Sequence, residues 1–367
     1  MILNPLPSIS IEEAMQKQFA FVDAVTEVFS GDELLTRGDL GVAGEWNMPQ
    51  TTKKVQQVLA RFFHAEDAVL VRGAGTAAIR YALNAVLAPG DAILIHDAPI
   101  YQTTINSMEV MGLQLVVADF NQKDAILKAL KEHPEIKAAL IQYTRQRIDD
   151  RYDIKEVINT IKSYVDIPII TDDNYAVMKV SQIGCEAGAD LSCFSTFKLL
   201  GPEGIGCIVG KQKYLKKIQK LHYSGGMQTQ GFEALEVLRG LVYAPVALAI
   251  QATVCEETAR RLNQQELPGV KQAMIANAQS KVILVEFEQE IAAEVLRHAV
   301  QLGAAPHPVG AESKYEFVPL FYRVSGTFLK QDPSLAKRMI RINPMRCGSD
   351  TIIKILQAAM ERVEACS

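Results

Sequence analysis

Short hydrophobic runs alternate with stretches of helical periodicity over the first half of the chain. After helical patterns at residues 11–29 and 51–64, the runs occupy residues 68–71, 92–95, 113–118, 138–143, 167–171, 191–195 and 205–210. Runs of this length, separated by helices, predict a mainly parallel seven-stranded sheet with helices on both faces, which makes three layers. The last two runs are joined by a loop too short for a helical crossover, so we expect one antiparallel strand there.

The pattern changes after about residue 232. A long helical period extends to about residue 263, and the rest of the chain predicts strands at 281–287, 317–324 and 339–343, with helices at 291–302 and from Asp350 onwards. This second part reads as a smaller α+β unit. The prediction is an α/β protein with an N-terminal helical segment at 1–50, a large domain at 51–250 and a small C-terminal domain at 251–367.

Composition narrows the class of protein. The chain has 367 residues, of which 49% are hydrophobic and 22% charged, and its formal net charge is −4. These values are ordinary for a globular enzyme and give no electrostatic case for binding nucleic acid. No run approaches the roughly 20 apolar residues of a membrane span, and residues 1–10 lack the pattern of a secretory signal. Six scattered cysteines without a C-x-x-C pair favour reduced thiols in a cytoplasmic protein, and no metal site is expected.

Ligands of open α/β sheets bind at the carboxyl ends of the strands, so residues there are the first candidates for chemistry. One candidate is the turn Gly75-Thr76-Ala77, between a predicted strand and a helix. Small residues at a helix N-terminus leave N–H groups open to a phosphate, although a plain tight turn is the alternative. Tyr101 follows the second run, where its ring could stack on a planar ligand or pack half-buried in the core.

The fifth run ends in two acids. Asp172 follows the strand directly, and Asp173 is its rival. A carboxylate at a strand end can pair with a pyridinium N–H and keep that ring protonated and electron-withdrawing. The alternative is an aspartate that only caps a helix or a turn.

Lys198 lies in a loop rich in Gly and Pro, between the sixth and seventh runs. This place is unusual, because lysines normally occupy the solvated faces of helices. An amine shielded from water between strands loses its proton more readily, which suits it to Schiff-base chemistry and proton transfer. Lys179 lies nearby in the sequence, but in what reads as an ordinary polar stretch, so Lys198 is preferred.

A fifth candidate, Arg341, belongs to the strand predicted at 339–343. An arginine at a strand end presents a planar fork that binds a carboxylate through two hydrogen bonds. The alternative is a surface arginine, and Arg338 and Arg346 lie close by in the sequence.

The segment from Ser195 to Gly206, Ser-Thr-Phe-Lys-Leu-Leu-Gly-Pro-Glu-Gly-Ile-Gly, resembles the Ser-x-x-Lys, Gly-Pro-x-Gly-x-Gly segment of fold-type-I pyridoxal-phosphate (PLP) enzymes of the aspartate aminotransferase superfamily. Its similarity is closest to class-V aminotransferases and cysteine desulfurases. In that group the Lys holds PLP as an internal aldimine, and the Ser binds the phosphate. Asp172 and Tyr175 are similar to the family's Asp-x-x-Tyr pattern, in which Asp meets the pyridine nitrogen and Tyr the 3′-oxygen. The resemblance covers about residue 51 to the C-terminus and implies a PLP-dependent transferase fold.

The resemblance also implies roles for the other candidates. Gly75-Thr76-Ala77 resembles the family's phosphate-binding turn, Tyr101 stands where the family places a stacking aromatic ring, and Arg341 where it binds the substrate carboxylate. A Gly-rich segment with Gln228 and Thr229 resembles one that reaches the neighbouring subunit's phosphate in dimeric relatives. The implied unit is therefore a homodimer with composite sites.

Three features depart from the family's pattern. Many members carry an Asn after the fourth strand to bond the 3′-oxygen, whereas this chain has Thr144-Arg145-Gln146. Phe197 replaces the His that often precedes the Lys in desulfurases. Cys347 directly follows the Arg-Ile-Asn strand and is not embedded in that group's mobile catalytic loop, so we expect it to be a bystander.

Together these residues predict an aminotransferase that acts on a small amino acid, with Lys198 holding PLP and moving the substrate proton. A β- or γ-eliminating lyase is the alternative, because the same cofactor chemistry can expel a leaving group, and cystathionine-lyase relatives share the fold. A protein that binds PLP without turnover is a third interpretation.

Overall fold

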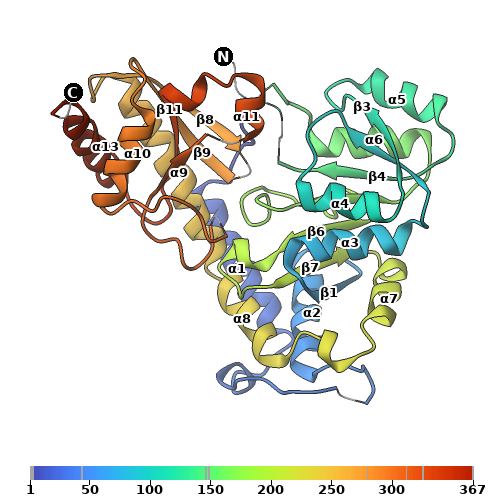
Figure 1. The fold of residues 1–367 in the computed structure, drawn as a ribbon. Coiled ribbons are helices and arrows are strands. Elements are labelled where there is room, and N and C mark those ends of the chain that lie inside the picture. The colour runs from blue at the N-terminus through green and yellow to red at the C-terminus, as the bar shows by residue number, and fades with distance from the viewer. Residues whose placement is uncertain are drawn as a thin grey trace. The chain divides into compact units, whose positions relative to one another are not determined.

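The computed structural model describes residues 4–42, 44–144, 147, 149–278, 280–310, 312–324 and 326–365. The chain divides into two compact units, whose elements are labelled in Figure 1. One unit consists of Glu12–Thr144 and Tyr152–Pro245, and the other of Met1–Ile11, Arg145–Arg151 and Val246–Ser367. The three domain ranges expected from the sequence stay a prediction.

The first unit contains the seven-stranded sheet, in the order β1-β7-β6-β5-β4-β2-β3. Its strands are β1 (Asp67–Arg72), β2 (Ala92–His96), β3 (Gln114–Ala118), β4 (Ile136–Gln142), β5 (Ile169–Asp172), β6 (Leu191–Ser195) and β7 (Ile205–Gly210). Neighbours from β6 to β3 pair in parallel, whereas β7 is antiparallel to both β6 and β1. The expected mainly parallel sheet and its antiparallel strand are confirmed.

Adjacent residues on these strands belong to two different hydrophobic cores. On β5, Ile170 packs in one core and Ile169 in the other, and on β2 the same holds for Ile93 and Leu94. Because side chains of a strand point alternately to its two faces, the sheet is buried on both sides. One core includes residues of α3 (Ala74–Val86), α4 (Gln102–Val110) and α7 (Gln212–Leu221), and the other includes residues of α5 (Lys123–Glu132) and α6 (Ile154–Tyr164). The three-layer arrangement is therefore confirmed (Figure 1).

Helices also flank this sheet at the start and end of the unit. They are α1 (Ile11–Thr26), α2 (Gln50–Phe62) and α8 (Gly231–Leu241), with short 3-10 turns η1 (Glu33–Leu35), η2 (Thr196–Leu199) and η3 (Gly225–Met227). The sequence pattern predicts one long helix from about residue 232 to 263, but the structure ends α8 at Leu241 and begins α9 (Ala244–Asn263) three residues later. The reason is Pro245, which lacks the N–H that a continuous helix would donate to the carbonyl of Leu241, four residues earlier.

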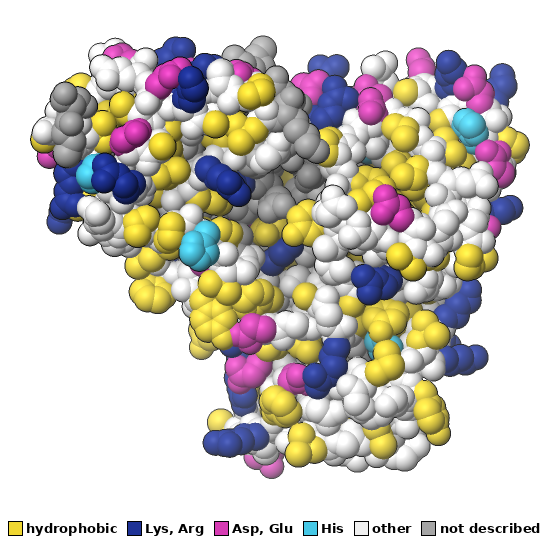
Figure 2. Space-filling model, in the orientation of Figure 1, with side chains coloured by type: hydrophobic (Ala, Val, Ile, Leu, Met, Phe, Trp, Pro, Cys, Tyr) yellow, Lys and Arg dark blue, Asp and Glu magenta, His cyan; other side chains and the backbone are white. Residues whose placement is uncertain are grey.

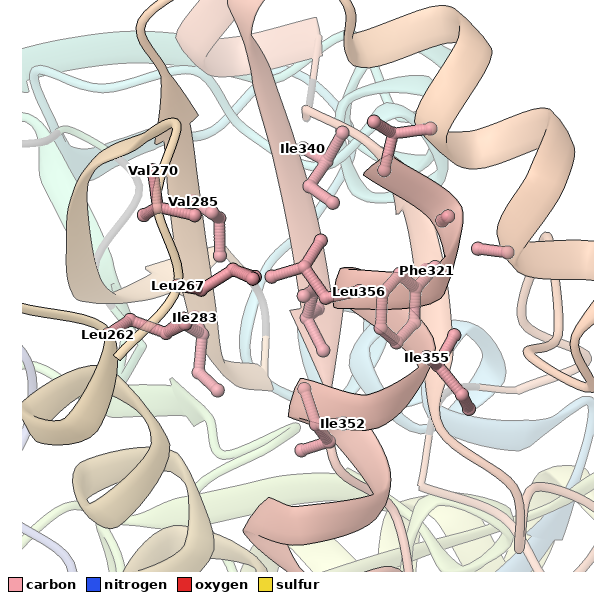
Figure 3. Packing of buried hydrophobic residues seen from close by; sticks show 14 of the residues in the cluster. Leu262, Leu267, Val270, Ile283, Val285, Phe321, Ile340, Ile352, Ile355 and Leu356 are labelled. Carbon is pink, nitrogen blue, oxygen red and sulfur yellow. The ribbon is translucent and has the colours of Figure 1, made fainter. Parts of the chain in front are cut away.

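The second unit contains a four-stranded antiparallel sheet, in the order β10-β11-β9-β8. Its elements are β8 (Val270–Ala278), β9 (Ser280–Phe287), β10 (Leu320–Arg323), β11 (Met339–Asn343), α9, α10 (Ala292–Gln301), α11 (Gly326–Gln331), α12 (Leu335–Arg338) and α13 (Ser349–Glu364). On β9, Ile283 packs in a core with Leu262 of α9 and Leu356 of α13 (Figure 3), while Leu284 packs with Phe328 of α11. Helices therefore cover both faces, and the smaller C-terminal α+β unit is confirmed.

No single helix in the described parts of the chain has the length and apolar character of a membrane span. Only Gly225–Leu241 and Ala244–Asn263 pass that test, and they pass it together, across a bend.

Candidate active site

Asp172 is the last residue of β5, and its side chain is buried at the end of the strand. Its Oδ1 accepts two hydrogen bonds from Asn174, one from the backbone N–H at 3.1 Å and one from Nδ2 at 2.7 Å. Burial raises the pKa of the Asp172 carboxyl, while the Asn174 hydrogen bonds and the nearby charge of Lys198 act in the opposite direction. The structure therefore brings the predicted acid and the predicted lysine together.

Asp173 has different surroundings. It is fully buried, and its Oδ2 accepts the N–H of Gly184 at 3.0 Å. Burial raises the pKa of Asp173 to about 7, against the opposing effect of hydrogen bonds from Ser192, Gly184 and Thr171. This carboxyl therefore ties the loop after β5 to the sheet, on contacts separate from those of Asp172.

Lys198 lies in η2, between β6 and β7, and is half-buried. Its Nζ is 4.0 Å from the centre of the Tyr175 ring, close enough for a cation–π interaction. The loop is held by the Thr196 hydroxyl, which donates to the carbonyl of Ile205 at 2.9 Å. Tyr175 itself has a left-handed backbone with φ of 66°, which is uncommon for a residue with a side chain.

The rival Lys179 was expected in an ordinary polar stretch, but only 7% of its surface is exposed. The prediction of an ordinary polar stretch there is wrong, because Ala176, Val177 and Met178 turn into the core and carry the chain inward. Its Nζ lies 5.6 Å from the Tyr175 ring, farther than that of Lys198.

The turn before α3 has the geometry of an anion-binding helix start. Gly73 precedes the helix with φ of 102°, and its N–H and that of Ala74 donate to the carbonyl of Gly204 at 2.7 Å and 2.9 Å. The N–H of Ala77 donates to the carbonyl of Gly73 at 3.1 Å. Within the described residues no acceptor faces the N–H groups of Gly75 and Thr76. These two donors at the positive end of the helix dipole remain open to a ligand.

Ser195 lies at the end of β6, and Tyr101 lies in the loop between β2 and α4. Ser195 ends β6, is buried, and donates its N–H to Oδ1 of Asn174 at 3.0 Å. Tyr101 precedes α4 and is 47% exposed, so its ring does not pack in the core. The hydroxyls of Thr76 and Thr103 lie 3.0 Å apart and join the first turns of α3 and α4.

The segment proposed to reach a partner subunit is buried within its own chain at two positions. The Gln228 side-chain amide donates to the carbonyl of His222, and Arg72 Nε donates to the Gln228 carbonyl at 3.1 Å. Thr229 is fully buried, and its carbonyl accepts the hydroxyl of Thr52 at 2.6 Å. Their role in binding a partner's phosphate stays a prediction.

Arg341 belongs to the second unit, on β11 between β10 and β9. Its guanidinium carbon lies 3.9 Å from the centre of the Tyr322 ring, and burial raises the pKa of that tyrosine to about 12. The rival Arg338 is held by Glu286 and Asp332 at 3.0 Å and 3.1 Å. Arg346 donates to Gln251 Oε1 at 3.0 Å, and burial lowers its pKa.

Two departures from the family's pattern have different outcomes. Arg145 and Gln146 lie outside the described residues, and Thr144 before them is buried. Cys347 is half-buried, its thiol lies 3.0 Å from the carbonyl of Pro344, and burial raises its pKa to about 11. A thiol in that state carries little of the thiolate that attacks sulfur.

The side chains of the first unit fit the functional groups of PLP. Lys198 offers an amine for the aldehyde carbon, and Asp172 offers a buried carboxylate for the ring nitrogen. The backbone of the Gly75-Thr76 turn offers two open N–H groups for the phosphate. Among the described residues no group of three or more His, Cys, Asp or Glu side chains could hold a metal ion. Asn174, which contacts both Asp172 and Ser195, was missed by sequence reasoning.

Comparisons with known proteins agree with this geometry. The family model described as aminotransferase class-V matches residues 41–239, and that described as YhfS-like, C-terminal domain, matches residues 256–356. The chain is 53% identical over 359 residues to the uncharacterized protein YhfS of Escherichia coli K12, covering 98% of this chain and 99% of that one. The crystal structure of the pyridoxal-5′-phosphate-dependent protein YhfS from Escherichia coli superposes with a TM-score of 0.97 at 52% identity, over 99% of this chain and 100% of the other.

The chain is also similar, at lower identity, to proteins with other names. A probable cysteine desulfurase of Haemophilus influenzae is 23% identical over 224 residues, which are 58% of this chain and 50% of the relative. A carbon-sulfur lyase involved in aluminum resistance from Clostridium novyi shares the fold with a TM-score of 0.72 at 19% identity, over 96% of this chain and 91% of the lyase. The chain therefore belongs to the class-V aminotransferase family of fold-type-I proteins and is a PLP-dependent enzyme.

Proposed function

We propose that the protein is an aminotransferase that acts on a small amino acid, with Lys198 as the residue that binds PLP. The observation that carries this proposal is the meeting of three groups at the ends of β5 and β6. Lys198 Nζ lies against the Tyr175 ring at 4.0 Å, and its charge acts on the buried carboxyl of Asp172. The family match at residues 41–239 supports the same chemistry.

PLP, when bound, supplies an electron sink that stabilises negative charge at the substrate Cα. Lys198 Nζ would be the base that takes the proton from the substrate Cα and returns it. The Tyr175 ring, 4.0 Å from Nζ, helps to fix the position of that amine. Asp172 keeps its carboxylate fixed through two hydrogen bonds from Asn174, and would thereby hold a proton on the ring nitrogen. The N–H groups of Gly75 and Thr76 would bind the phosphate.

Arg341 is proposed to bind the substrate carboxylate. Its guanidinium carbon lies 3.9 Å from the centre of the Tyr322 ring, a contact that orders the side chain before a ligand arrives. Ordering in advance lowers the entropy lost when a carboxylate is bound through two hydrogen bonds. Arg338 is less suited, because its guanidinium is already paired with Glu286 and Asp332.

A C–S lyase is the second candidate, because relatives of the chain include a probable cysteine desulfurase and proteins of its fold include a carbon-sulfur lyase. Cys347 argues against a desulfurase within that class, since a thiol with a pKa near 11 is a poor nucleophile at neutral pH. A β- or γ-elimination needs no such thiol.

We also propose that the active unit is a homodimer. Large exposed hydrophobic side chains lie on two segments of the first unit, Leu40 and Trp46 on one and Tyr223 and Phe232 on the other. The segments are joined by hydrogen bonds, such as that from the Gly231 N–H to the Asp39 carbonyl at 3.0 Å. Figure 2 shows hydrophobic side chains gathered at several places on the face that it draws. Burying such surface against a second copy would be favourable.

A cytoplasmic location is proposed as well. The five cysteines within the described residues, Cys185, Cys193, Cys207, Cys255 and Cys347, are all free. Free thiols suit a reducing compartment.

An absorbance screen against a panel of amino acids tests the reaction. An aminotransferase should convert the bound cofactor to its amine form with one amino acid and return it with a keto acid, whereas a lyase should release ammonia and a keto acid without that cycling. A Cys347→Ser variant should keep full activity in either case. Absence of any spectral change with the whole panel, in a protein that holds PLP, would contradict the proposal of an enzyme on amino acids.

A further inference from the structure

We infer that Asn174 is a positioning residue that joins the acid for the ring nitrogen to the strand end of the lysine loop and to the phosphate-binding turn. The inference rests on the proposed roles of Asp172 and of the Gly75 turn. It adds a residue that neither the family pattern nor the sequence reasoning points to.

The Asn174 side chain uses both ends of its amide. Its Nδ2 donates to Oδ1 of Asp172 at 2.7 Å, and its Oδ1 accepts the N–H of Ser195 at 3.0 Å. The backbone N–H of Asn174 donates to the same carboxylate oxygen at 3.1 Å. One side chain thus bridges the carboxyl ends of β5 and β6, which carry the proposed acid and lead into the proposed lysine loop.

The orientation of the amide follows from its neighbours. The N–H of Ser195 is only a donor and must therefore face the amide oxygen, so the amide nitrogen faces Asp172. An ionised aspartate in place of Asn174 would have the same shape, but its second oxygen would face Oδ1 of Asp172, and both atoms are acceptors. A leucine would present neither a donor nor an acceptor. Only an amide of this length supplies a donor to one strand end and an acceptor to the other.

Asn174 also determines how closely the phosphate-binding turn approaches the end of β5. A Cβ placed on Gly75 would lie 2.7 Å from Oδ1 and 2.8 Å from Nδ2 of Asn174, far inside van der Waals contact. The absence of a side chain at Gly75 therefore lets the first turn of α3 rest on this amide. The position of the open N–H groups and the position of the acid are tied to the same side chain.

The electrostatic consequence concerns the proton on the ring nitrogen. Burial raises the pKa of Asp172, and the hydrogen bonds from Asn174 oppose that rise. The other charged or titratable groups described around Asp172 are Lys198 from η2, the adjacent Asp173 and Cys193 of β6. Without the Asn174 donor, Asp172 is more often protonated, and a neutral carboxyl holds a pyridinium proton less well.

The test follows the proton itself. The protein is loaded with PLP labelled with ¹⁵N in the ring, and the nitrogen shift is recorded by NMR from about pH 6 to about pH 9. The variants Asn174→Leu and Asn174→Ala should each lower the pH at which the nitrogen loses its proton by about one to two pH units, the size of one hydrogen bond to a charged group. PLP affinity, measured by calorimetry on the apoprotein, should fall roughly 10- to 100-fold.

Thr171→Val is the matched control. It removes the buried hydrogen bond between the hydroxyls of Thr171 and Ser192, which lie 3.0 Å apart. Thr171 precedes Asp172 in the chain, but the hydrogen bonds to the Asp172 carboxylate come from Asn174 and stay intact. This variant should lose stability and leave the ring-nitrogen titration unchanged. If Asn174→Leu and Asn174→Ala also leave that titration unchanged while Asp172→Asn shifts it, the role given to Asn174 is wrong. If Asp172→Asn leaves it unchanged too, the proposed acid itself is wrong.

Discussion

Replacing Asp173 by Asn should stabilise the protein as the pH rises. The Asp173 carboxyl is fully buried and has a pKa near 7, so the folded protein must hold a buried charge in alkaline solution. The gap between the ordinary value of 3.8 and about 7 corresponds to about 4 kcal/mol at full ionisation. Asn keeps the oxygen that accepts the Gly184 N–H and carries no charge. The substitution should therefore relieve the cost and keep the contact.

The sign of the pH effect follows from linkage. A carboxyl whose folded pKa is raised binds its proton more tightly in the folded state, so its contribution is fully present below about pH 4 and is lost as the pH rises to about 7. Between pH 5 and pH 8 the stability of Asp173→Asn relative to the wild type should grow by about 2–3 kcal/mol.

Urea unfolding of the apoprotein at both pH values measures this difference. Asp124→Asn, at an exposed position on the first turn of α5, is the control and should show no such growth. If the gain of Asp173→Asn were the same at pH 5 and at pH 8, the reasoning from a buried, ionising carboxyl would be refuted. A large loss of PLP from this variant would also show that the two acids had been assigned the wrong way round.

The remaining predictions concern the proposed site. Asp172→Asn should keep the fold and retain PLP with weaker affinity, but lose most of its turnover, as single-turnover kinetics would show; normal turnover would place the ring acid elsewhere. Arg341→Lys should lower kcat/KM roughly 10- to 100-fold through KM, because one point charge replaces a fork of two donors; an unchanged KM would exclude it from carboxylate binding. Mixing Lys198→Ala chains with chains altered at both Gln228 and Thr229 should restore part of the activity, since one sound composite site forms per heterodimer. An active monomer in sedimentation would contradict that arrangement.

The large sheet was predictable because most of its strands are buried on both faces, although the edge strand β3 exposes Leu115 and Val117. β6 and β7 have the limits that the hydrophobic runs predict, since turn residues bound each run. β8 at the sheet edge was missed, because Lys271, Gln272 and Asn277 break its hydrophobic pattern. The split between α8 and α9 was missed because a periodic pattern hides the effect of Pro245 on the backbone.

The candidate site was predictable where chemistry follows a strand directly. Asp172 and Lys198 could be chosen because each stands at or just after the end of a buried run. Asn174 could not, since its importance depends on Ser195 and Gly75, which are distant in sequence and become neighbours only in the fold. The burial of Lys179 had a signal in the sequence, because the apolar residues Val177, Met178 and Val180 flank it and are buried with it.

The central claim is that Lys198 binds PLP covalently. Borohydride reduction of the PLP-loaded protein, followed by digestion and mass spectrometry of the peptides, measures the attachment site directly. The adduct should be found on Lys198, and Lys198→Ala should lose both the adduct and the visible absorbance of the bound cofactor while its circular dichroism stays that of the wild type. An adduct on Lys179, or one that persists in the Lys198→Ala protein, would contradict the account.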